Sequence, residues 1–75
     1  MEKLKGYMSK LFRVPVEDIF DTATMDDIAG WDSLAHMELI IVIEKEYGIQ
    51  LSGDDIADMQ SVQEIQRILK KKNVF

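Results

Sequence analysis

Apolar residues in this chain recur at intervals of three and four, and the strict alternation expected of a half-buried β-strand is nearly missing. Because this spacing places apolar side chains on one face of a helix, the pattern predicts an all-α fold. The stripe in the first segment is Leu4, Met8, Leu11 and Phe12. The stripe in the last segment is Val62, Ile65, Ile68 and Leu69.

Local signals predict the end of the first helix and the nature of the segment after it. Pro15 disfavours helical dihedral angles at Val14, so the first helix is expected to end near Arg13. A long polar connection then runs from Val14 to about Trp31, with a short turn around 17–20. Its apolar residues are expected to attach it to the core: Ile19, Phe20, Met25 and Ile28.

Capping residues predict three further helices. The second is expected to begin at Asp32 or Ser33 and to run to Tyr47, with Gly48 as its stop. A short third helix, 53–58, is started by Ser52. The last opens with a capping box, in which Ser61 and Glu64 satisfy each other's free backbone N–H groups. The expected fold is a small antiparallel four-helix bundle, with three main helices, one short helix and a long loop between the first two.

Size and charge exclude several function classes. Seventy-five residues make one small domain, 1–75, without room to enclose a substrate, and no cysteine is present for a disulfide, a thiolate metal site or a thiol nucleophile. The net charge is −5, distributed as +3 over 1–16, −12 over 17–64 and +4 over the remainder. This sign excludes nucleic acid as a charge-attracted partner and favours basic protein partners.

The apolar runs are short, which bears on localisation. The longest, Leu39 to Ile43, cannot span a bilayer, and the start of the chain lacks the apolar core of a secretory signal. We therefore expect a cytoplasmic monomer that does not insert into membranes. An EF-hand calcium loop starting at Asp21 is excluded, because Ala23 and Met25 stand where oxygen ligands are needed.

The second helix carries two apolar stripes. One contains Ile40, Ile43 and Tyr47, with Leu39 beside them, and the other contains Leu34, Met37 and Ile41. Glu38 and Glu44 flank the second stripe. A surface helix of a small bundle buries one stripe, so the second is either a contact surface for a partner with a basic rim or a face buried under the long loop. Periodicity leaves both interpretations open.

Ser33 allows three interpretations. A serine at a helix start is ordinarily a cap. A hydrolase nucleophile with His36 is disfavoured, because no third orienting group and no G-x-S-x-G elbow are present, and His36 faces the loop side of the core, where it packs or hydrogen-bonds. Covalent modification would place a phosphate beside free N–H groups at the positive end of the helix dipole. Spacing does not decide among them.

The motif Asp32-Ser33-Leu34, followed by Met37-Glu38-Leu39 and by the segment 44–49, resembles the acyl carrier protein family and its D-S-L motif at the start of helix II. The resemblance covers nearly the whole chain, in helix order, total length and the Ser61-Val62 start of the last helix. It implies a carrier, not a catalyst, in which Ser33 receives 4′-phosphopantetheine from coenzyme A through a phosphopantetheinyl transferase (holo-acyl-carrier-protein synthase). The thiol of that arm carries acyl groups as thioesters.

The resemblance also implies a docking surface on helices II and III for the transferase and for acyl-loading and acyl-processing enzymes with basic surfaces. Asp32 and Leu34, which flank the attachment serine, are expected to bind the cofactor with it, and also to contact partners as an acid and an apolar residue. The docking residues carried over by position are Met37, Glu38, Ile41, Glu44, Asp54 and Asp55. The stripe with Ile40, Ile43 and Tyr47 corresponds to the family's acyl cavity. No catalytic residue and no metal ligand is implied.

Four residues depart from the pattern of fatty acid synthesis. Trp31 stands where small residues are common, Ala35 and His36 replace acidic or small polar residues, and Lys45 interrupts the acidic ridge. Trp31 also differs from the Gly-Gly-Asp-Ser pattern of peptidyl carrier domains. These departures favour a discrete carrier of a specialised pathway, and the cargo stays open among fatty acid, polyketide and aminoacyl groups. The alternative function is an unmodified acidic helical module that docks through Leu34, Met37 and Ile41.

Overall fold

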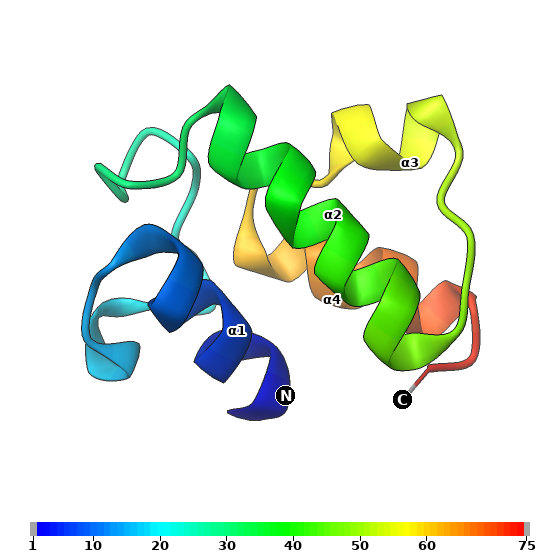
Figure 1. Ribbon diagram of the computed structural model, residues 1–75, viewed down its shortest axis with the longest axis horizontal. Coiled ribbons are helices and arrows are strands. Elements are labelled where there is room, and N and C mark those ends of the chain that lie inside the picture. The colour runs from blue at the N-terminus through cyan, green and yellow to red at the C-terminus, as the bar shows by residue number, and fades with distance from the viewer. Residues whose placement is uncertain (1, 75) are drawn as a thin grey trace.

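The computed structural model describes residues 2–74, which form four α-helices, one 3-10 turn and no strand. The elements are α1 (Glu2–Phe12), η1 (Val16–Asp18), α2 (Ser33–Tyr47), α3 (Gly53–Asp58) and α4 (Val62–Lys71). The all-α prediction is confirmed, with three longer helices, one short helix and a long connection before α2. Figure 1 shows α1 running opposite to α2, while α4 lies behind α2 and advances in the same left-to-right sense.

Three helices end in the same hydrogen-bonded turn. Arg13, Gly48 and Asn73 each have a φ near +60°, and the next residue's N–H donates back to the carbonyl five positions earlier, as in Val14 to Ser9. The end of α1 is thus a left-handed residue at Arg13 and not only the effect of Pro15. The Ser9 hydroxyl donates to the Val14 carbonyl at 2.6 Å, which reinforces this turn.

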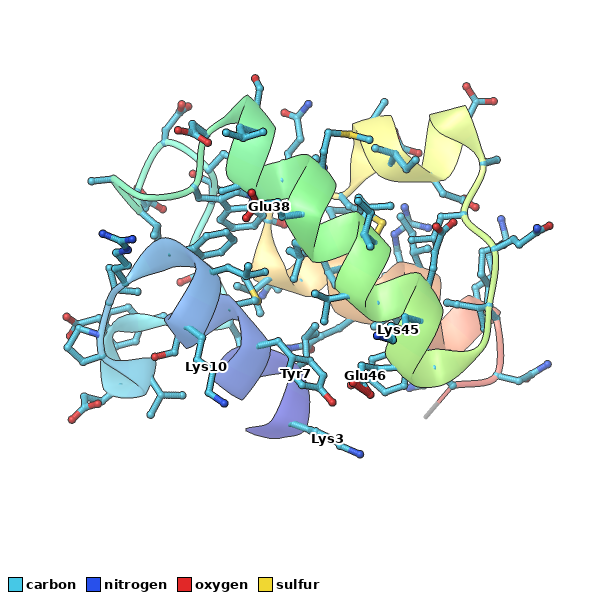
Figure 2. The ribbon with its side chains drawn as sticks, viewed as in Figure 1. Lys3, Tyr7, Lys10, Glu38, Lys45 and Glu46 are labelled. Carbon is cyan, nitrogen blue, oxygen red and sulfur yellow. The ribbon has the colours of Figure 1, made fainter. Side chains whose placement is uncertain are left out.

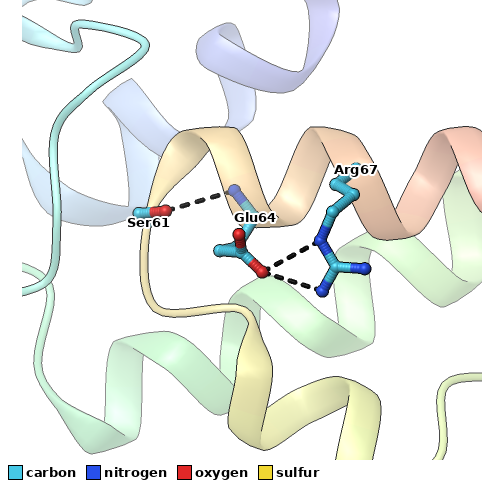
Figure 3. A network of polar contacts seen from close by, with 3 residues as sticks. All are labelled: Ser61, Glu64 and Arg67. Atoms are coloured by element: carbon cyan, nitrogen blue, oxygen red, sulfur yellow. Dashed lines mark hydrogen bonds and ion pairs between the residues drawn. The ribbon is translucent and has the colours of Figure 1, made fainter.

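The serine caps are confirmed, but the capping box lies at a different helix. Ser61 caps α4 by accepting from the Glu64 N–H at 3.1 Å, yet the Glu64 carboxylate turns to Arg67 Nε and Nη2, at 3.0 and 2.8 Å (Figure 3). The predicted reciprocal box at α4 is therefore wrong, because the guanidinium of Arg67 takes the carboxylate. The complete box belongs to α3, between Ser52 and Asp55.

The core forms where α1, α2 and α4 meet. The side chains of Leu4, Met8, Leu39, Ile43, Ile65 and Leu69 are fully buried. Burial raises the pKa of the Tyr47 hydroxyl at the end of this contact, and the nearby Tyr7 and Glu46 add to the shift. Figure 2 shows Tyr7 of α1 and Glu46 of α2 at that lower end of the α1–α2 contact. Both predicted stripes, on the first and last helices, face this core.

The long connection 13–32 packs against the helices through some of its predicted anchors. Ile19 and Ile28 are buried and Met25 is partly buried, but Phe20 is 64% exposed, so its prediction as an anchor was wrong. Ala23 takes a buried place instead, where its carbonyl accepts from the Val62 N–H and holds the connection against the start of α4. The turn predicted at 17–20 is the 3-10 turn Val16–Asp18.

An ion pair attaches the same connection to α1. Lys5 Nζ lies 2.8 Å from Asp21 Oδ1, and the Gln66 side chain of α4 donates to the same oxygen at 3.3 Å. The hydrogen bond from Lys5, followed by that from Gln66 and the charge of Lys5, lowers the pKa of Asp21 below its ordinary value. Asp21 thus joins the connection to two helices at the surface.

Candidate functional site

At the start of α2, the hydroxyl of Ser33 makes no hydrogen bond with the described residues. Asp32 is the N-cap, and its Oδ1 accepts from the Ala35 N–H at 2.8 Å. Ser33 is therefore the first helical residue and not the cap, and its side chain is exposed to solvent. The two residues that the sequence offered for capping have separate roles: the carboxylate holds the helix start, and the hydroxyl stands beside it.

The four serines of the chain differ in what their hydroxyls do. Ser9 donates to Val14, while Ser52 and Ser61 accept from backbone N–H groups at the starts of α3 and α4. Among the four serines, all of which lie in the described range 2–74, Ser33 alone has no hydrogen-bond partner for its hydroxyl. It is also the serine that lies at the positive end of the longest helix, where an attached anion is favoured by about 0.3–1 kcal/mol.

The second apolar stripe of α2 is exposed. Leu34, Met37 and Ile41 are 71%, 48% and 61% accessible, whereas Leu39, Ile40 and Ile43 are buried. This settles the two interpretations of the stripe in favour of a solvent-facing surface, since the long connection does not cover it. Exposed large apolar side chains that gather on one helix face are typical of a contact surface.

The acidic residues of this surface fall into two groups. Glu38 and Asp54 are exposed and engage no other side chain among the described residues. Glu44, by contrast, accepts the Leu51 N–H at 2.9 Å and is half-buried. Asp55 accepts the Ser52 N–H and pairs with Lys72 Nζ, both at 3.2 Å, and these hydrogen bonds, that from Ser52 first, lower its pKa. Two of the predicted docking acids thus hold the fold together.

One cation shares the outward face of α2. Figure 2 shows Glu38 on the upper half of α2 and Lys45 on its lower half. Lys45 is exposed and makes no ion pair with any described residue. It lines an open hollow of about 640 Å³ with Ile41, Glu44 and the 49–51 segment. The acidic character of the surface is therefore concentrated near Ser33 and is weaker at the far end of α2.

Beside Ser33, on the inner side, lies a buried polar network that the sequence did not predict as a unit. Trp31 Nε1 donates to His36 Nδ1 at 3.0 Å, and His36 Nε2 lies 3.0 Å from the Ile56 carbonyl oxygen. The Trp31 ring is stacked on Phe12, with 5.1 Å between centroids. His36 thus has the hydrogen-bonding role expected for it. The sequence signal was an unusual Trp directly before the D-S-L motif, with a His five residues later.

The surroundings of Ser33 do not supply the partner that a hydrolase serine needs. His36, the proposed partner of a hydrolase serine, has both ring nitrogens engaged with Trp31 and Ile56. Across residues 2–74 no group of three metal-binding side chains comes together. None of the helices in that range is sufficiently long and apolar to cross a membrane. What the start of α2 offers is one exposed, unengaged hydroxyl at a helix start.

Comparison with known proteins shows the family of the chain. Residues 2–69 match the family described as "Phosphopantetheine attachment site". The chain is 35% identical over 72 residues to the acyl carrier protein of Buchnera aphidicola subsp. Schizaphis graminum, covering 96% of this chain and 91% of that protein. It is 36% identical over 72 residues to the acyl carrier protein of Desulforapulum autotrophicum, covering 96% and 84%.

A relative of another kind also matches. The chain is 34% identical over 68 residues to a non-reducing polyketide synthase of Emericella nidulans, covering 91% of this chain and 3% of the synthase. The match therefore spans nearly all of this protein but one small part of a much longer one. The matching unit is thus most of the chain in the two acyl carrier proteins and a small part of the polyketide synthase.

Proposed function

Since the chain belongs to the acyl carrier protein family, whose members carry acyl groups on a covalently attached 4′-phosphopantetheine, we propose that Ser33 is the attachment residue and that residues 1–75 form one carrier domain. The observation that carries this proposal is the hydroxyl of Ser33, which alone among the four serines is exposed and unengaged. The attached group supplies the thiol that a chain without cysteine lacks.

The chemistry asked of Ser33 is one phosphoryl transfer. Its Oγ forms a bond to the phosphorus of coenzyme A that bears the pantetheine, the bond from that phosphorus to the adenosine bisphosphate half breaks, and the hydroxyl proton leaves to a base of the transferase. Ser33 stays in place because Asp32 caps the helix with a 2.8 Å hydrogen bond and Trp31 is buried. The hydroxyl itself makes no hydrogen bond with the described residues, so its modification breaks none.

The exposed face of α2 is the proposed docking surface. Leu34, Met37 and Ile41 supply apolar contact, and Glu38 supplies charge beside them. Asp54 on α3 adds a second exposed carboxylate. A basic rim on the transferase and on acyl-loading and acyl-processing enzymes would complement this surface. The carboxylates of Glu44 and Asp55, both engaged within the protein, contribute less to docking in this proposal than Glu38 and Asp54 do.

The experiment that tests the attachment residue is incubation with coenzyme A, Mg²⁺ and a broad-specificity phosphopantetheinyl transferase, followed by intact-protein mass spectrometry. One phosphopantetheinyl group is expected per chain. Ser33→Ala should remain unmodified while retaining the helical circular dichroism of the wild type. Ser9→Ala is the matched control and should still accept one group.

Two results would contradict the proposal. A folded wild-type protein without any mass change would remove the attachment, and the acidic interaction module would then be the better description. A mass change that persists in Ser33→Ala would move the attachment to another residue. If the module interpretation holds, protein purified from its host lacks the arm, yet Glu38→Lys still abolishes partner binding.

Cargo and localisation complete the proposal. Relatives include separate acyl carrier proteins and a polyketide synthase, so fatty acid and polyketide groups are both compatible cargo classes. Intact mass spectrometry of the protein from its host reports the modification and the acyl group together. We also propose that the carrier is a cytoplasmic monomer. Cell fractionation tests the location, and sedimentation analysis tests the oligomeric state.

A further inference from the structure

We propose that Trp31 and His36 are positioning residues that hold α3 against α2, and that the indole N–H of Trp31 selects the His36 tautomer that binds α3. The structural part of this proposal is independent of the function of Ser33. Its consequence for docking rests on the function proposed above. The two parts are tested by different measurements.

Few other contacts fix the position of α3. It contains six residues, fewer than an isolated helix needs to persist in water, and none of them is fully buried. Ile56 is partly buried against the core. Two polar contacts attach α3 to the rest of the protein: Asp55 pairs at the surface with Lys72, directly after α4, and the Ile56 carbonyl lies 3.0 Å from His36 Nε2. The second contact is the buried one.

The tautomer of His36 follows from its partners. An indole nitrogen donates and never accepts, so Nδ1 of His36 must present its lone pair to Trp31 Nε1. The neutral ring then carries its proton on Nε2, where it donates to the Ile56 carbonyl. In the other neutral tautomer, Nε2 and the carbonyl would face each other with lone pairs. The Trp31 N–H therefore favours the tautomer in which His36 attracts α3.

Trp31 is itself held in one orientation. Its ring is 2% exposed, and it is stacked on Phe12 with an angle of 15° between the planes. Gly30 makes this approach possible, because a side chain at position 30 would overlap the backbone of Phe12. The indole N–H consequently has no freedom to turn from His36 to another acceptor, and its effect reaches α3 through the imidazole.

The network of Trp31, His36 and Ile56 affects docking because it connects α2 and α3, the two helices that carry the proposed docking surface. Trp31 is two residues before Ser33, and His36 belongs to the first turns of α2, next to Met37. Ile56 belongs to α3, two residues after Asp54. Fixing Ile56 against His36 therefore sets where Asp54 lies relative to the exposed stripe of α2, and a partner meets both at once.

The first test reads the tautomer directly. The chain has a single histidine and a single tryptophan, so two-bond ¹H–¹⁵N spectra of the protein at neutral pH give one imidazole pattern, expected to be that of the neutral Nε2–H form. In Trp31→Phe, which keeps a ring for stacking but lacks the N–H, we expect this pattern to be lost or mixed. Phe20→Leu is the control, which removes an exposed aromatic ring outside the network and should keep the wild-type tautomer.

The second test measures how readily α3 opens locally. Hydrogen exchange of the Ile56 and Met59 amides, divided by that of Ile65 in α4, separates local opening of α3 from global unfolding. In Trp31→Phe and in His36→Phe this ratio should rise about tenfold. His36→Gln, whose amide can accept from the indole and donate to the Ile56 carbonyl, should recover part of the protection.

The third test reads docking. With coenzyme A and the transferase, Trp31→Phe should raise the KM for the carrier about three- to tenfold and leave kcat within about twofold, since the hydroxyl of Ser33 is untouched.

A wild-type histidine in the Nδ1–H or doubly protonated form, or an unchanged exchange ratio in Trp31→Phe, would overturn the hold on α3. An unchanged KM with faster α3 exchange would overturn its role in docking alone. A wild type that accepts no phosphopantetheine would refute the function of Ser33, while the first two tests still judge the network.

Discussion

Ile41 and Ile43 lie two residues apart on α2, yet one is 61% exposed and the other fully buried. The same contrast runs along the helix: Leu34, Met37 and Ile41 face solvent, while Leu39, Ile40 and Ile43 face the core. The inner face of α2 is apolar because it packs into the core of the bundle. The outer face is also apolar, although the bundle does not bury it. Apolar surface that folding leaves exposed indicates binding, here next to an unengaged serine.

The largest effect should come from the buried half of this comparison. Ile43→Ala removes a fully buried side chain from the contact of α2 with the core and should lower the free energy of unfolding by about 2–4 kcal/mol. Ile41→Ala is the matched variant on the exposed face and should change it by less than about 0.5 kcal/mol. Urea denaturation followed by circular dichroism checks both. Similar losses in the two variants would mean that the outward face is also part of the core.

The next effect should appear on the outward face, in binding and not in stability. Glu38→Lys should raise the KM of the transferase for this carrier about tenfold at low salt, because it reverses the charge beside Met37. A tenfold change corresponds to about 1.4 kcal/mol. The difference from wild type should shrink at high ionic strength. Glu46→Lys is the control, since Glu46 is exposed on the side of α2 near Tyr7 (Figure 2). If both variants lose affinity equally, net charge and not this face directs docking.

A smaller effect on stability should distinguish the two glutamates that flank the exposed stripe of α2. Glu44→Ala removes the acceptor of the Leu51 N–H and should cost about 1–1.5 kcal/mol of stability, whereas Glu38→Ala should cost close to nothing. Thermal unfolding of both variants measures this difference. Equal melting temperatures would show that the hydrogen bond to Leu51 contributes no net stability and would return Glu44 to the docking group.

The smallest effect concerns the neighbouring acids of α3. Hydrogen bonds from Ser52 and Lys72 lower the pKa of Asp55 in the folded protein, so its contribution to stability is present above the pKa of the unfolded chain and is lost as the pH falls through the folded value. From about pH 5 to pH 3, Asp55→Asn should therefore lose less of its melting temperature than the wild type does. Asp54→Asn, which removes an exposed and unengaged carboxylate, is the comparison. A pH profile in which Asp55→Asn matches the wild type would contradict the assignment.

Much of the fold was predictable from local patterns. The stripes of the first and last helices, the Gly48 stop and the serine starts of α3 and α4 all follow from neighbouring residues, and the structure confirms them. The errors are also informative. Phe20 was predicted as an anchor by its hydrophobicity, but the connection turns at Asp21 to reach Lys5 and leaves the ring outside. Glu64 was assigned to the capping box, but Arg67 lies one turn away and binds its carboxylate.

The candidate site was predictable to a different degree. The sequence pointed to Ser33 through the Asp32-Ser33-Leu34 motif, but left open whether its hydroxyl caps the helix and whether the stripe beside it is exposed. Tertiary structure answered both questions by assigning the cap to Asp32 and by packing the other face of α2 into the core. It also showed that Glu44 binds the Leu51 N–H beyond the end of α2 and that Asp55 pairs with Lys72, contacts that depend on how the chain turns back on itself.

The sequence by itself determined the helical class, the helix boundaries within a few residues and the family, because these depend on local spacing, caps and motifs. Only the tertiary structure decided which apolar face meets water, which carboxylates remain available to a partner, and that Trp31, His36 and Ile56 form one buried network. The reason is physical: burial and hydrogen bonding between distant segments depend on how the helices pack, and helical periodicity states only which residues share a face.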